Sequence, residues 1–125
     1  MMQYDPMTQP PTDEWLALEE AEQIALVSAH HRPIEATIPR PEVHAVIHVV
    51  VENQLAEGIE PARDALERLL AQGLDRHEAI HAIASVLMEH MRILVQEKPT
   101  GPDPHERYFQ DLKEMTADKW LKDDR

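Results

Sequence analysis

The chain has 125 residues, no cysteine and a formal net charge of −12, from 24 acidic and 12 basic residues. The lack of cysteine excludes disulfides and thiolate metal sites, and the negative charge argues against nucleic-acid partners because phosphate groups would be repelled. Because no apolar run approaches the about 20 residues that span a bilayer and no secretory signal is evident, we expect a one-domain, bacterial-type cytoplasmic protein without a membrane partner.

The N-terminal part of the chain predicts an arm, a helix and a connector. Residues 1–11 are polar and rich in proline, which is typical of a flexible arm. Thr12 is a suitable N-cap for the next segment, whose apolar spacing predicts a helix over residues 13–30. The proline-rich stretch 31–41 that follows indicates a connector.

The segment VHAVIHVVVEN is ambiguous, because its β-branched residues alternate as they would in a strand. A helix is favoured, since both alternating faces would be largely apolar and no other segment offers a strand to pair with it. Pro41 then stands at the first helical position, and Gly58 provides a left-handed cap at the C-terminal end.

Three further helices are predicted, over residues 61–72, 75–98 and 104–124. The predicted fold is an all-α bundle of about five helices with up-down-up core connectivity. Residues 12–98 are predicted to form the bundle, and residues 99–125 to add a hinge and a C-terminal amphipathic helix.

Two histidine pairs share one spacing, His44 with His48 and His77 with His81. Residues four apart lie on one face of a helix, and both pairs fall in the first turns of their predicted helices. The helix over residues 61–72 is short and is expected to run antiparallel to both neighbours. The two pairs would then meet at one level of the bundle, on two parallel helices, as in other metal sites of bundle cores.

Glu52 lies one turn beyond His48 and is a candidate carboxylate ligand. Four histidines and a glutamate suit a transition metal, with zinc or iron favoured and nickel or copper as alternatives, rather than calcium or magnesium. Monomer and homodimer both stay open, since two pairs can also be completed across a dimer axis. His90 lies about 220° around the helix from His77 and is predicted to point away from the site.

The second pair also forms the motif His-Glu-x-x-His, which binds zinc in many metalloproteases. Glu78 would be the general base of such a hydrolase and is the candidate catalytic residue. Asp75 and Glu78 also fit a capping box, which explains the glutamate without catalysis. Enzyme activity is therefore left open by the sequence.

Chance placement offers a simpler explanation of the histidines. Eight histidines in this chain give an expectation of about half a pair at this spacing, against the two that are present. If the histidines are merely packed or exposed, the chain is a metal-free interaction module that contacts a partner through its acidic surface or its last helix. A di-iron bundle is a third alternative, although such proteins carry more carboxylates at Glu-x-x-His spacing.

The segments EVHAVIHVVVENQLA and PARDALERLLAQGLDRHEAIHAIASVLME resemble the bacterial family called domain of unknown function 1841. EEAEQIALVSAHH and, more loosely, PDPHERYFQDLKEM are also similar, so the resemblance touches most of residues 19–115. No activity is established for that family, so the resemblance implies none. The chain departs from the family pattern at Glu52. The recurrent polar positions that the resemblance implies are His44, His48, His77, Glu78 and His81.

Overall fold

The computed structural model describes residues 2–31, 40–96 and 105–123, and the only regular elements in this part of the chain are α-helices. The prediction of an all-α fold is confirmed, with seven helices among the described residues in place of about five. They are α1 (Thr12–Ala17), α2 (Glu20–His31), α3 (Pro41–Ala56), α4 (Glu60–Ala71), α5 (Arg76–Gln96), α6 (His105–Glu114) and α7 (Ala117–Asp123).

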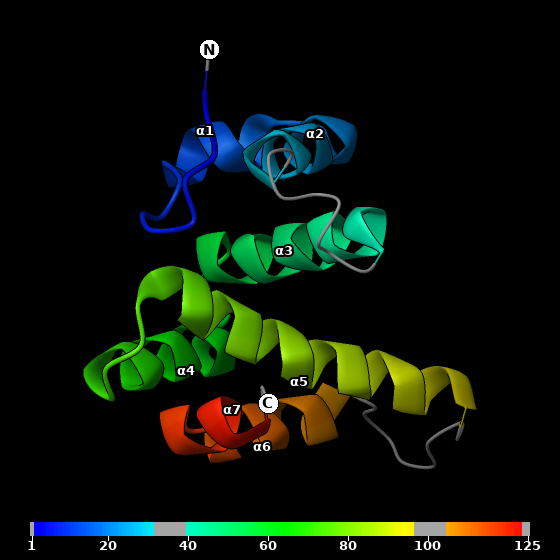
Figure 1. Ribbon diagram of the computed structural model, residues 1–125. Helices are drawn as coiled ribbons and strands as arrows, with labels where there is room; N and C mark the ends of the chain where they lie inside the picture. The colour runs from blue at the N-terminus through cyan, green and yellow to red at the C-terminus, as the bar shows by residue number, and fades with distance from the viewer. Residues whose placement is uncertain (1, 32–39, 97–104, 124–125) are drawn as a thin grey trace.

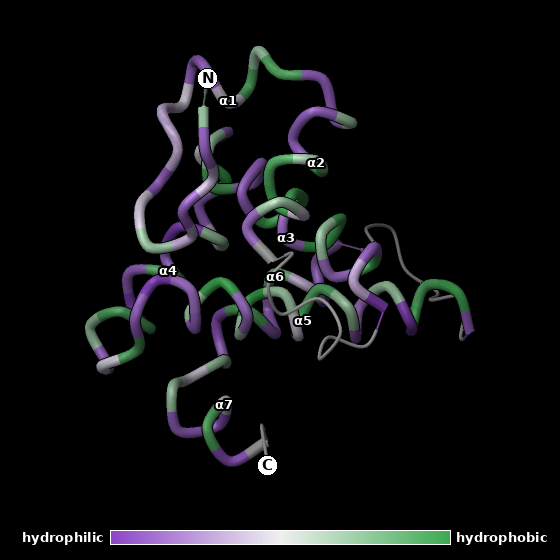
Figure 2. The backbone as a smooth tube through the Cα atoms, turned by 45° about the horizontal axis from the view of Figure 1, so that its top comes forward, coloured by the Kyte–Doolittle hydropathy of each residue, from purple (hydrophilic) through white to green (hydrophobic). Residues whose placement is uncertain are grey.

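The helices form a stack (Figure 1). α1 and α2 lie at one end, α3 comes next, α4 and α5 follow, and α6 and α7 lie at the other end. Along most helices the backbone alternates between hydrophobic and hydrophilic residues, as expected for helices that bury one face (Figure 2). None of the described helices is long and apolar enough to cross a membrane.

The central position of α3 explains its ambiguous sequence pattern. Ile47 and Val51 face the larger apolar core, which is shared with α4, α5 and α6. Ala45 and Val49 face a smaller core, shared with the N-terminal segment (residues 2–11), α1 and α2. A helix covered on two sides is apolar nearly all round, and this is why alternation along the sequence resembled a strand.

Both ends of α3 follow the sequence. Pro41 is its first residue, as predicted, where the missing N–H has no intrahelical partner to lose. Gly58 has a φ of 73° just beyond the last turn, which confirms the left-handed cap. Gly73 has a φ of 105° after α4 and ends that helix in the same region of backbone space.

Two predicted helices are each divided in the structure. Thr12 is the first residue of α1 and not its cap, because Pro11 occupies the capping position. The backbone turns extended at Leu18, and Gln23 stabilises the break by donating a side-chain hydrogen bond to the carbonyl of Trp15. The C-terminal helix breaks before α7, where Thr116 Oγ1 accepts the amide of Lys119 as a cap.

α3 and α5 lie side by side and run in opposite directions (Figure 1). Glu52, late in α3, meets Arg76 at the start of α5, and His48, one turn earlier, meets His81. The prediction that these two helices are parallel is therefore wrong. It assumed an up-down-up path in which the helix over residues 61–72 returns along α3, whereas α4 packs more extensively against α5 and α6.

The N-terminal segment, residues 2–11, has no helix before Thr12, yet it is packed against the bundle. It was expected to be a loose arm, but Tyr4 and Pro6 are both buried. The predicted connector over residues 31–41 and the predicted hinge before α6 lie largely outside the described residues.

Candidate metal site

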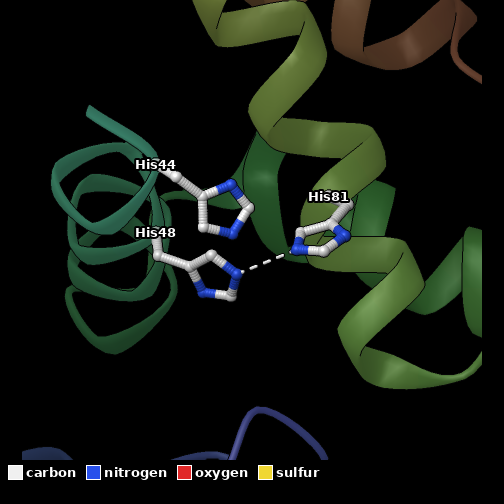
Figure 3. Close-up of side chains that lie close together, drawn as sticks. All are labelled: His44, His48 and His81. Carbon is white, nitrogen blue, oxygen red and sulfur yellow. Dashed lines mark hydrogen bonds between the residues drawn. The ribbon is translucent and has the colours of Figure 1, made fainter. Parts of the chain in front are cut away.

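Three histidines converge between α3 and α5 (Figure 3). His44 and His48 lie one turn apart on α3, and their rings face His81 of α5. One ring nitrogen from each residue lies within 4.8 Å of the others. The shortest separation joins Nε2 of His48 to Nε2 of His81, at 3.1 Å.

The separation between the Nε2 atoms of His48 and His81 is close to that of two nitrogen ligands on one ion. Two nitrogens bound to zinc at their usual distance and at a tetrahedral angle lie about 3.3 Å apart. His48 is fully buried, whereas His44 and His81 are half-buried, so the group is covered on the His48 side and reachable by solvent on the other.

His77 joins the ring cluster without joining the group of three nitrogens. Its ring centroid lies 4.3 Å from that of His81 and 5.3 Å from that of His48. It also contacts His30 of α2, at 5.9 Å. The structure therefore brings all four predicted histidines together, and three of them share the geometry of a common ligand set.

Glu52 lies behind this group and not within it. Its carboxylate accepts two hydrogen bonds from the guanidinium of Arg76, at 2.8 and 2.9 Å. Its Oε2 also accepts a bond of 2.6 Å from the hydroxyl of Tyr4. The same hydroxyl lies 3.0 Å from Nδ1 of His48. Glu52 thus reaches the histidines through Tyr4.

The chain of contacts from Arg76 to Tyr4 decides which ring nitrogen of His48 carries the proton. Glu52 is the carboxylate partner of Arg76 in a buried ion pair, so it accepts hydrogen bonds and the Tyr4 hydroxyl donates to it. The Tyr4 oxygen then accepts from Nδ1–H of His48. Nε2 of His48 is left with a lone pair aimed at His81.

Two consequences follow for the site. Burial, and next the negative charge of Glu52, raise the pKa of the Tyr4 hydroxyl, so its proton stays in place at neutral pH. Nε2 of His48 and Nε2 of His81 cannot both present lone pairs to each other at 3.1 Å, because these would repel. Either a proton on His81 or a cation has to lie between them.

Glu78, the candidate general base, contacts α7. Its carboxylate accepts a hydrogen bond of 2.7 Å from Nε1 of Trp120 in α7. Its amide donates to Oδ1 of Asp75, so the first half of the predicted capping box is present. The His-Glu-x-x-His motif therefore points in two directions, His81 toward α3 and Glu78 toward α7.

The sequence did not single out Tyr4 or Arg76. Arg76 stands beside His77 in the first turn of α5 and is buried, which requires an acidic partner, but only the fold identifies that partner as Glu52. Tyr4 lies 44 residues from His48 in a segment without periodicity, so no local signal connects the two.

His90 lies outside the site, as its position on the helix predicted. Its ring stacks on Tyr108 of α6, with ring centroids 5.4 Å apart, and contacts His105 at 5.8 Å. His90 is buried, and neither of its ring nitrogens has a hydrogen-bond partner among the described residues.

No protein-family model, curated protein or solved structure matches this chain.

Proposed function

We propose that this protein binds one transition-metal ion through His44, His48 and His81. The observation that supports the proposal best is the meeting of three imidazole nitrogens within 4.8 Å, one of which is oriented from behind. Ligand histidines usually donate their second ring N–H to an outer partner that fixes ring and tautomer, and the Tyr4–Glu52 pair has that role here.

The ligand chemistry favours zinc, with iron as the second candidate and nickel or copper as alternatives. Imidazole suits all four ions, and the separation between His48 and His81 matches tetrahedral zinc. Three protein ligands leave a coordination position for water or a small ligand. His77, whose ring adjoins that of His81, is the candidate fourth ligand. Under this proposal Glu52 orients His48 and does not bind the ion.

The geometry supports metal binding better than peptidase activity. A hydrolase of the His-Glu-x-x-His type needs both histidines of the motif on the ion and the glutamate at its water. Here the closest nitrogens include His81 but not His77, and the carboxylate of Glu78 bonds to Trp120. The resemblance to domain of unknown function 1841 implies no activity that would favour catalysis.

The test is a zinc titration of protein that carries no affinity tag, together with elemental analysis of the protein as purified. Wild type should bind one equivalent, and His81→Ala should weaken binding by more than the about 100-fold that loss of an outer partner costs. His105→Ala is the matched control, because this exposed histidine lies on α6. If wild type binds no metal, or if His81→Ala binds as wild type does, the proposal is wrong and the metal-free interaction module takes its place.

A further inference from the structure

The N-terminal segment, residues 2–11, is fixed in a defined shape although it contains no helix before Thr12. A turn holds its middle, since the amide of Thr8 donates to the carbonyl of Asp5 and the amide of Met7 donates to the Asp5 side chain. Tyr4 and Pro6 are its buried residues.

The polar contacts of this segment with α3 and α5 converge on the groups that orient His48. The hydroxyl of Tyr4 bonds to Glu52 and to Nδ1 of His48. The carbonyl of Pro6 accepts a hydrogen bond of 2.9 Å from Nη1 of Arg76, the same nitrogen that donates to Glu52. Arg76 and Glu52 therefore bind the segment and fix the tautomer of His48 at once.

Apolar packing places the segment over the same part of α3. The Tyr4 and His48 rings are nearly perpendicular, with centroids 5.8 Å apart, and the Tyr4 ring also lies 5.8 Å from the indole of Trp15. It also lies 6.0 Å from the ring of His30. Removal of the segment would expose the buried side of His48 and leave Nδ1 without its oxygen acceptor.

We infer that residues 2–11 are a latch on the metal site, so that seating of the segment and metal affinity reinforce each other through Tyr4. This inference rests on the proposed metal site. A cation on Nε2 of His48 makes Nδ1–H a stronger donor and so strengthens its bond to Tyr4. By linkage, a seated Tyr4 raises the metal affinity by the same factor by which metal favours seating.

Tyr4→Phe tests the latch, because it removes the hydroxyl and keeps the ring. Tyr108→Phe is the matched control, since Tyr108 is also buried and its hydroxyl also bonds to α3, at Gln54 Oε1. Zinc affinity is measured by competition with a chelator. Tyr4→Phe should bind zinc about 10- to 100-fold more weakly than wild type, the usual effect of losing an outer partner, while Tyr108→Phe binds normally.

A second measurement needs no variant of the latch itself. Hydrogen exchange of the amides in residues 2–11 should slow by about the same factor when zinc is added to wild type, and should not respond to zinc in His81→Ala. The amides of Met7 and Thr8 are hydrogen-bonded within the turn of this segment, so their exchange follows how well the segment is ordered. The measurement uses wild type and His81→Ala, so the result stands even if Tyr4→Phe folds poorly.

The outcomes separate the two proposals. If wild type binds zinc, His81→Ala does not, and Tyr4→Phe binds as tightly as Tyr108→Phe, the latch is overturned and the metal site stands. Zinc-independent exchange of residues 2–11 in a wild type that binds zinc also overturns the latch. If wild type binds no zinc, the metal site fails and the latch fails with it.

Discussion

His48 and His90 are almost equally buried, with exposed fractions of 1% and 4%, but their surroundings are opposite. His48 has an oxygen acceptor on one ring nitrogen and a second histidine opposite the other. His90 has a tyrosine ring stacked against it, and the described part of the chain gives neither of its nitrogens a hydrogen bond. Burial alone therefore does not identify a ligand. The two histidines differ in whether a hydrogen bond fixes one ring nitrogen while the other ring nitrogen faces the nitrogen of a neighbouring histidine.

The two buried tyrosines repeat the contrast. Tyr4 donates to a carboxylate that an arginine also binds, so its orientation is fixed by charge. Tyr108 donates to the neutral amide of Gln54, and its ring serves as a packing surface for His90. The region around His48 is organised by ionic hydrogen bonds, whereas the region around His90 is organised by apolar contact.

The largest effect is expected where the ionic contacts of the region around His48 are broken. Arg76→Met leaves the Glu52 carboxylate buried without its cation, and this should lower the free energy of unfolding by about 3–5 kcal/mol. Arg92→Met is the control, since Arg92 pairs with Glu89 at the surface and the loss should be at most about 1 kcal/mol. Urea denaturation measures both. Equal losses would show that the ion pair of Glu52 does not organise the region.

The fold class was accessible from the sequence, and so were the ends of most helices. These features depend on residues close together in the sequence, namely the apolar periodicity of each helix, Pro41 and Gly58. They can therefore be predicted from short stretches of the chain. The division of α1 from α2 was missed, because it depends on the side chain of Gln23 reaching the carbonyl of Trp15.

The candidate site was only partly predictable, for a related reason. Spacing of four residues placed His44 beside His48, and this holds whichever way the helix runs. The direction of α5 relative to α3 depends on where α4 packs, and the sequence does not encode that contact locally. The partners of Glu52 follow from the same tertiary packing, so its position behind the histidines was not visible.

Zinc should stabilise the protein only through the region around His48. At a free zinc concentration 100 times the dissociation constant, the free energy of unfolding should rise by about 2.7 kcal/mol. His48→Ala should abolish this gain, and His90→Ala should keep it even though a buried histidine is lost in both variants. Denaturation with and without zinc measures the difference. A gain that depends on His90 would reverse the assignment of the two regions.

A smaller effect is expected at Glu78. This residue belongs to the His-Glu-x-x-His motif, but its carboxylate bonds to Trp120 of α7. Trp120→Phe removes the hydrogen bond to the Glu78 carboxylate and should lower the free energy of unfolding by about 1 kcal/mol. Zinc affinity should stay unchanged, as it should in Glu78→Gln. Loss of zinc binding in Glu78→Gln would place this carboxylate at the metal and revive the hydrolase alternative.

The smallest change at neutral pH is expected from His90→Leu, which replaces a ring without hydrogen bonds by an apolar side chain of similar size. The free energy of unfolding at pH 7.5 should change by less than about 1 kcal/mol, because no hydrogen bond is lost. Acid should reveal the difference between the two proteins.

Burial lowers the pKa of His90, the charge of His105 lowers it further, and Asp111 opposes this shift more than Arg107 supports it. The unfolded chain therefore binds a proton at His90 at a higher pH than the folded protein does. Wild type should lose stability as the pH falls below about 6.5, the ordinary value for histidine, and His90→Leu should lose less between pH 7.5 and 5.5. Both proteins keep the histidines around His48, so their difference isolates His90. Identical losses would mean that His90 takes up its proton equally in the folded and unfolded states, and the contrast with His48 would then rest on geometry alone.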